Sequence, residues 1–280
     1  MSILSAAEII SLQQIVQQAG QIGLSYFGKN VKNWQKSDNT PVSEADLKVN
    51  EFLEAQLKAF RPEFGWLSEE TIDDLARQDK QYIWVIDPID GTKAFIKGDA
   101  EWVVSVAIVK NNRPVAGVVY DPVAGLLYFA QTGQGAHIIE VKNGLFLPDA
   151  PLKTSIRSDV NNANLLAYKF HFDHMAERSG YVWPDMNYSN VNSMALRVAL
   201  VAQGKFDAMV SFTQKSEWDI AAADIIIHEA GGRITDGYGN ILTYNKTEPN
   251  LPHMVAAGGE FHRKIIQHTM NFNFLTDTKM

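Results

Sequence analysis

The segment Trp84-Val85-Ile86-Asp87-Pro88-Ile89-Asp90-Gly91-Thr92 decides the fold of this chain. It continues an apolar run that begins at residue 82, and such a run is typical of a strand that helices cover on both faces. Asp87 and Asp90 close the run, where two neighbouring carboxylates repel each other and lose solvation. A divalent cation would relieve both penalties. The segment therefore predicts a metal site at the end of a buried strand.

Gly91-Thr92 is predicted to open a helical turn directly after that strand. Pro88 stiffens the preceding turn, and Gly91 lets the backbone approach a ligand closely. The free N–H groups of the helical turn would point at the two aspartates and could hold a phosphate. Taken alone, Asp87 is an ordinary turn residue and Asp90 an ordinary helix N-cap. It is the complete string that indicates a functional site.

Two amphipathic helices are predicted before this strand, over residues 5–27 and 43–60. Ser43 is the expected N-cap of the second helix, with Asp46 three positions later as a capping acid. After Thr92 four strands are expected, over residues 102–109, 115–120, 126–130 and 136–140. The links between them contain Asn, Gly and Pro, which predicts hairpins and therefore an antiparallel meander.

Residues 141–190 are rich in Asn, Asp and Pro, and we interpret them as the join between two halves of the chain. Beyond the join the pattern predicts a helix over 193–203, a strand over 206–212 and a helix over 218–230. Gly231-Gly232 would end the last helix, and Gly258-Gly259 is interpreted as a loop. The expected organisation is an N-terminal half, residues 1–150, and a C-terminal half, residues 151–280, in one compact unit.

Composition excludes several classes of protein. The chain has 280 residues, 25 basic against 32 acidic, and a net charge of −7, so binding to nucleic acid is disfavoured. There is no cysteine, which excludes disulfides, thiolate catalysis and cysteine-bound zinc or iron–sulfur clusters. The start of the chain lacks the pattern of a signal peptide, and apolar stretches such as 103–109 are far shorter than the ~20 residues that span a bilayer. We expect a cytoplasmic protein that does not contact membranes.

Further acidic residues lie outside the central segment. Glu69 and Glu70 follow Trp66-Leu67-Ser68, and Asp219 precedes a helix of small residues. Each has an ordinary interpretation by itself: a solvated pair for the glutamates, an N-cap for Asp219 and a first-turn helix acid for Asp46.

Together these motifs, in this order along nearly the whole chain, resemble the inositol monophosphatase family. The matching motifs are Thr40-Pro41-Val42-Ser43-Glu44-Ala45-Asp46, Ser68-Glu69-Glu70, the 87–92 string, Trp218-Asp219 and Glu229-Ala230-Gly231-Gly232. The resemblance implies a magnesium-dependent, lithium-sensitive phosphatase with a layered α-β-α-β-α sugar-phosphatase fold, commonly a homodimer. The fold class is therefore expected to be α/β (α+β).

The resemblance also implies the roles of individual residues. One Mg²⁺ would be held by Glu69, Asp87 and the carbonyl of Ile89, a second by Asp87, Asp90 and Asp219, and Glu69 with waters would help a weaker third ion. Asp46 and Thr92, with Glu69, match the catalytic residues that orient and deprotonate the attacking water. The predicted contacts to the substrate, a small phosphate ester, are Ile89, Asp90, Gly91, Thr92, Lys93, Ser193 and Glu217.

The motifs also bear on the identity of the substrate. Inositol-specific members of the family carry a glutamate where this chain has Ser211 and Phe212. The motifs around Glu69, Lys93 and Glu217 look like the branch that removes the 3′-phosphate from adenosine 3′,5′-bisphosphate. We therefore predict a 3′(2′),5′-bisphosphate nucleotidase, with inositol-1-monophosphatase and then histidinol phosphatase as alternatives.

Parts of the sequence also fit two other classes of function. Phosphatases with an aspartate nucleophile place two aspartates one residue apart, so that both carboxylates point the same way along a strand. The gap of two residues here, Pro88-Ile89, predicts that this paired geometry is lost. A regulatory binding protein that kept the fold is the non-enzymatic alternative, and the complete set of metal ligands argues against it.

Overall fold

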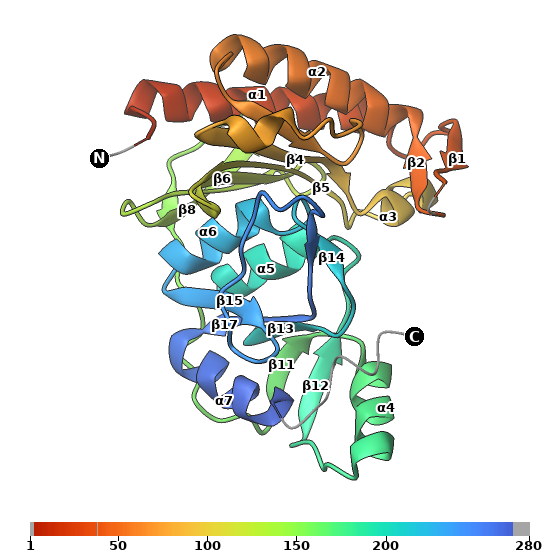
Figure 1. Ribbon diagram of the computed structural model, residues 1–280, viewed down its shortest axis with the longest axis vertical. Helices are drawn as coiled ribbons and strands as arrows, with labels where there is room; N and C mark the ends of the chain where they lie inside the picture. The colour runs from red at the N-terminus through yellow and green to blue at the C-terminus, as the bar shows by residue number, and fades with distance from the viewer. Residues whose placement is uncertain (1–2, 38, 271–280) are drawn as a thin grey trace.

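The computed structural model describes residues 3–37 and 39–270. Its elements stack in five layers, helices α1 and α2, a first sheet, helices α5 and α6, a second sheet, and helices α4 and α7 (Figure 1). This arrangement confirms the expected mixed α/β class and its alternation of helix pairs and sheets.

The outer helix pair forms as its sequence predicts. Helix α1 (Ala6–Tyr26) starts at the N-cap Ser5, and α2 (Glu44–Phe60) starts at the N-cap Ser43. Asp46 accepts a hydrogen bond from the backbone N–H of Ser43, which completes a capping box. A small hairpin of β1 (Asn33–Gln35) and β2 (Pro41–Ser43) joins the two helices.

The first sheet contains the predicted meander. Strands β4 to β8 are each antiparallel to the next, in sequence order, and β3 adds to the edge of β4 in parallel. Their bounds are β3 (Gly65–Ser68), β4 (Tyr82–Asp90), β5 (Val103–Lys110), β6 (Arg113–Asp121), β7 (Leu126–Gln131), β8 (Ala136–Lys142), β9 (Leu145–Phe146) and β10 (Ala150–Pro151). The short 3₁₀ helix η1 (Ala76–Asp79) precedes β4, and α3 (Thr92–Lys97) follows it with Gly91 as its N-cap.

The second sheet corrects the interpretation of residues 141–190 as a join. That stretch contains β11 (Ala163–Leu166), α4 (Lys169–Ser179) and β12 (Met186–Ser189), which belong to the second half. The strand order is β12-β11-β13-β17-β15, with β13 (Ala208–Ser211), β15 (Gly232–Asp236) and β17 (Met254–Gly258). Gly258-Gly259 is not a loop, because β17 ends there and α7 (Gly259–Thr269) begins.

Helices α5 (Met194–Ala202) and α6 (Ala221–Glu229) lie between the two sheets and join the halves in one core. Val85 of the first sheet and Met209 of the second belong to the same buried cluster. Gly117 on β6 lets α6 approach closely, since a Cβ there would lie 2.6 Å from the carbonyl oxygen of Ala222. Helices α5 and α6 are therefore packed closely between the two sheets.

Candidate active site

A β-bulge at the end of β4 places two aspartates on one side of the strand. Asp87 pairs with Ser105 and Asp90 with Val103, so Pro88 and Ile89 together oppose a single residue of β5. Residues three apart on a regular strand face opposite sides, and the one extra residue cancels that difference. The expectation that the two-residue gap abolishes a paired geometry is therefore wrong, because the bulge restores it.

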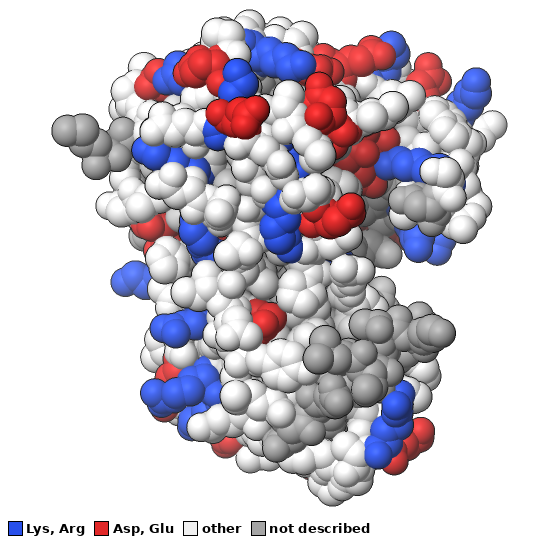
Figure 2. All heavy atoms as spheres, viewed as in Figure 1, with Lys and Arg blue, Asp and Glu red and all other residues white. Residues whose placement is uncertain are grey.

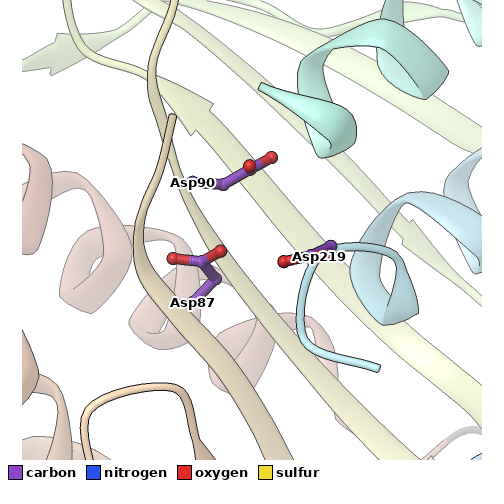
Figure 3. Close-up of side chains that lie close together, drawn as sticks. All are labelled: Asp87, Asp90 and Asp219. Carbon is purple, nitrogen blue, oxygen red and sulfur yellow. The ribbon is translucent and has the colours of Figure 1, made fainter. Parts of the chain in front are cut away.

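Asp219 completes a cluster with these two residues. One carboxylate oxygen from each of Asp87, Asp90 and Asp219 lies within 4.8 Å of the others (Figure 3). Asp219 comes from the turn before α6, and its carboxylate accepts a hydrogen bond of 2.9 Å from the backbone N–H of Ser216. The structure thus brings together, across the two halves, the three aspartates that the sequence predicted as metal ligands.

Three carboxylates this close together repel one another unless they are protonated or bind a cation. Burial is the largest cause that raises the pKa of Asp87 well above its usual range, and the charge of Glu69 adds to it. Burial and then the charge of Asp90 raise the pKa of Asp219 to about 8. Because hard cations such as Mg²⁺ prefer carboxylate oxygens, this buried donor set fits a divalent cation.

Asp90 is held by the first turn of α5. Its Oδ2 accepts hydrogen bonds of 2.6 Å from the hydroxyl of Ser193 and 2.6 Å from the backbone N–H of Ala195. Burial raises the pKa of Asp90, and these hydrogen bonds oppose that rise. Ser193 is fully buried and is also the N-cap of α5, while its contact with substrate stays a prediction.

Asp46 and Thr92 form the predicted pair. The Oγ1 of Thr92 lies 2.9 Å from Oδ1 of Asp46 and 3.0 Å from the carbonyl oxygen of Ile89. The other carboxylate oxygen of Asp46 accepts hydrogen bonds from Ser43. Burial raises the pKa of Asp46, which makes it a better proton acceptor than an exposed aspartate.

Glu69 follows β3 and lies beside the cluster, where it forms an ion pair of 2.9 Å with Lys36. The neighbouring Glu70 contacts the same Lys36 at 2.6 Å, and burial raises the pKa of Glu70 to about 7. Lys36 was not predicted from the sequence, where it belonged to a polar link between two helices.

A pocket of about 180 Å³ opens over the cluster. It is lined by Thr40, Pro41, Glu69, Asp87, Ile89, Asp90, Gly91, Thr92, Lys93, Asn192 and Asp219. Most residues that the sequence assigned to metal and phosphate thus meet at one surface, and Lys93 is exposed at its rim. Asn192 was not predicted, and its backbone and side-chain N–H groups bind Glu101 across the two halves at 2.9 and 2.8 Å.

Glu217 does not join the residues that line this pocket. It is fully buried, and its two carboxylate oxygens accept backbone N–H groups of Asn245 at 2.6 Å and Lys246 at 3.0 Å. Both carboxylate oxygens of Glu217 thus bond the backbone of one loop. The contact of Glu217 with substrate, which the resemblance implies, stays a prediction.

Acidic and basic side chains are interspersed on the face drawn in Figure 2. Within residues 3–37 and 39–270, no helix combines the length and the apolar character required to cross a membrane.

Comparison with known proteins gives matches over almost the whole chain. The model of the inositol monophosphatase family matches residues 5–271. A 3′(2′),5′-bisphosphate nucleotidase CysQ from Aggregatibacter actinomycetemcomitans is 35% identical over 265 residues, which cover 89% of this chain and 91% of that protein. An inositol-1-monophosphatase from Mesorhizobium japonicum is 33% identical over 237 residues, with 80% and 85% covered.

Solved structures agree with these relatives. The extragenic suppressor protein suhB from Bartonella henselae has a TM-score of 0.77 at 25% identity, covering 94% of this chain and 98% of that one. CysQ from Bacteroides thetaiotaomicron has a TM-score of 0.74 at 28% identity, covering 91% and 97%. The names of the relatives confirm the predicted enzyme class, a phosphoric monoester hydrolase.

Proposed function

Because this chain belongs to the inositol monophosphatase family, we propose that it is a Mg²⁺-dependent phosphatase that removes the 3′-phosphate of adenosine 3′,5′-bisphosphate. The observation that carries the proposal is the cluster of the buried Asp87 and Asp90 with the half-buried Asp219, next to the Asp46–Thr92 pair. Three acidic oxygens and a polarised hydroxyl at one pocket are what hydrolysis of a phosphate ester requires.

The predicted ligand sets remain our proposal for the metals. Glu69, Asp87 and the carbonyl of Ile89 would hold one Mg²⁺, Asp87, Asp90 and Asp219 a second, and Glu69 would help a weaker third. When bound, the ions would polarise the phosphate and lower the pKa of a bound water. The ion pair with Lys36 engages Oε1 of Glu69, and a carboxylate has a second oxygen that can bind a metal.

The chain's own residues would orient the attacking water. When the hydroxyl of Thr92 donates to Asp46, its free lone pair can accept a hydrogen bond from water and aim that water at phosphorus. The proton of the water can then pass through the hydroxyl to Oδ1 of Asp46. The N–H groups of Gly91 and Thr92, which line the pocket, are the proposed contacts to the phosphate.

The choice of substrate rests on two observations. Relatives named 3′(2′),5′-bisphosphate nucleotidase are 35% and 31% identical to this chain over most of its length. Ser211 carries no carboxylate, and its hydroxyl lies 3.3 Å from the carbonyl oxygen of Thr213. The exposed Lys93 at the rim is available for the charge of a second phosphate.

Inositol-1-monophosphatase is the second candidate, favoured by the relative that is 33% identical. Phosphate release from the two substrates, measured side by side with Mg²⁺, decides between them. We expect a higher kcat/KM for adenosine 3′,5′-bisphosphate, and Lys93→Ala should lower that value more than the value for inositol 1-phosphate. A tenfold preference for inositol 1-phosphate would reverse the assignment. Lithium sensitivity, a homodimer and a cytoplasmic location remain predictions.

A further inference from the structure

One buried arginine holds a loop at the edge of the first sheet, although that loop is distant from the sheet in the sequence. The loop is formed by residues 244–249, between Leu242 and strand β16 (Asn250–Leu251). Arg77 lies in η1, and its side chain is fully buried. Its guanidinium donates to the side-chain oxygen of Asn245 and, at 2.8 Å, to the carbonyl oxygen of Lys246. These contacts join residues 168 and 169 positions apart.

Arg77 is itself fixed within the first half. Two of its nitrogens lie 3.0 and 2.7 Å from one carboxylate oxygen of Asp73. Its backbone packs on the start of β3, where a Cβ at Gly65 would lie 2.9 Å from the Cα of Arg77. A planar guanidinium held in this way presents its remaining donors in a fixed direction.

Glu217 holds the same loop from the second half. Its carboxylate accepts the N–H groups of Asn245 and Lys246, the two residues whose oxygens Arg77 contacts. The loop therefore lies between a buried cation and a buried anion, each of which bonds different atoms of the same two residues.

Glu217 stands two residues before Asp219 in a tight turn. The backbone N–H of Glu217 donates to the carbonyl oxygen of Pro249 at 2.8 Å, and its own carbonyl accepts from Ala221 at 2.9 Å. Within that turn the N–H of Ser216 donates to Asp219. Hydrogen bonds thus connect loop 244–249 to the turn that carries Asp219.

We propose that Arg77 and Glu217 are positioning residues that set the distance of Asp219 from Asp87 and Asp90 through loop 244–249. The proposal rests on the metal cluster of the proposed function and assigns Glu217 to cation affinity rather than to substrate. Residues that orient a metal ligand change affinity for the metal by roughly ten- to a hundredfold when they are removed.

The test uses Mn²⁺, which takes the same oxygen ligands, and counts free Mn²⁺ by electron paramagnetic resonance. Arg77→Met keeps the apolar stem and removes the donors. We expect it to raise the dissociation constant for Mn²⁺ about tenfold. At saturating Mg²⁺ the substrate KM should stay within about twofold of wild type, since no substrate contact is removed. Glu217→Gln should act in the same direction.

Arg61→Met is the control, because Arg61 forms its ion pair with Glu8 on the outer helix layer. It should leave Mn²⁺ binding unchanged. If Arg77→Met does not fold, Asn245→Gly removes only the side-chain acceptor at a residue whose φ of 62° suits glycine. A weakening of Mn²⁺ binding of about threefold is expected there.

Unchanged Mn²⁺ affinity in a folded Arg77 or Asn245 variant would overturn the proposal. So would a Glu217→Gln variant that binds Mn²⁺ normally and has a raised substrate KM, because Glu217 would then contact substrate. If the wild type binds Mn²⁺ but releases no phosphate from any substrate, the proposed function fails, and the dissociation constants still decide the role of Arg77.

Discussion

In the first sheet neighbouring strands follow one another along the chain from β4 to β8, whereas in the second sheet β13 lies between β11 and β17. The same contrast holds for the site residues. The first half shapes its acids by local geometry, a capping box at Asp46 and a bulge between Asp87 and Asp90. The second half contributes through contacts between residues that are distant in the sequence. Ser193 donates to Asp90, and Glu217, which lies near Asp219, accepts from Asn245. Substitution of Asp90 or Thr92 in the first half should therefore remove chemistry, and substitution of Ser193 in the second half should weaken the alignment of Asp90.

Asp90→Asn should lower activity the most. Asp90 belongs to the bulge of the first half and also accepts a hydrogen bond from Ser193 of the second half. The amide keeps the shape and loses the charge that a cation needs, so we expect kcat/KM to fall at least about a hundredfold. Without metal the variant should unfold at the same or a higher temperature, since one buried charge is gone. Turnover near that of the wild type would contradict the metal assignment.

Thr92→Ala comes next and tests the first half alone. Loss of the hydroxyl removes the proton path to Asp46, which should lower kcat by about 10²-fold. Mn²⁺ affinity should stay close to that of the wild type, and Thr92→Ser should recover most of the rate. A loss of Mn²⁺ binding equal to the loss of rate would show that Thr92 serves the metal instead.

Ser193→Ala tests the second half alone. It removes one of the hydrogen bonds that hold Asp90. We therefore expect the Mg²⁺ concentration that gives half-maximal activity to rise roughly tenfold. Raising Mg²⁺ should restore most of the rate. Since Ser193 also caps α5, the unfolding free energy should fall by about 1 kcal/mol. A rate that stays low at every Mg²⁺ concentration would contradict this alignment role.

His262 lies on α7, away from the site. Its substitution should leave activity unchanged but alter how the free energy of unfolding depends on pH. Burial lowers the pKa of His262 from 6.5 to about 4, and its Nε2 lies 2.9 Å from the hydroxyl of Thr235. Below pH 6.5 His262 is protonated in the unfolded chain, whereas in the folded protein it stays neutral until the pH falls to about 4. Stability from this residue is therefore present above pH 6.5 and lost as pH falls through 4.

Urea denaturation at pH 7 and pH 5 measures this effect. His262 should account for about 2 kcal/mol of the loss of unfolding free energy between these pH values. His262→Asn should be less stable at pH 7 and show a smaller loss. An equal loss in both proteins would mean that other groups cause the pH dependence.

Much of the first half could be predicted because its signals are local. Ser43 and Asp46 lie three residues apart, and the strands of the meander are joined by turns that contain Asn, Gly or Pro. Asp87 and Asp90 could be predicted as site residues for the same reason, because the motif that contains them spans only a few residues.

The second half was harder because its structure depends on distant partners. Strands β11 and β12 are four residues each and pair in parallel, so the polar stretch around them resembled a linker. The bulge in β4 depends on its register with β5, which the sequence of β4 does not contain. The direction of the Ser193 side chain follows from Asp90 and that of Glu217 from loop 244–249, and both partners are distant in the sequence.

The bulge between Asp87 and Asp90 also bears on how such sites should be recognised in other chains. An interval of one residue on a regular strand and an interval of two with a bulge present their acids on the same face. A search that counts the residues between acids would separate proteins whose carboxylates are arranged alike. Comparing the face of the sheet to which each acid belongs would group them together. Ile89 is one of the two residues in this bulge, and its carbonyl oxygen lies 3.0 Å from the hydroxyl of Thr92.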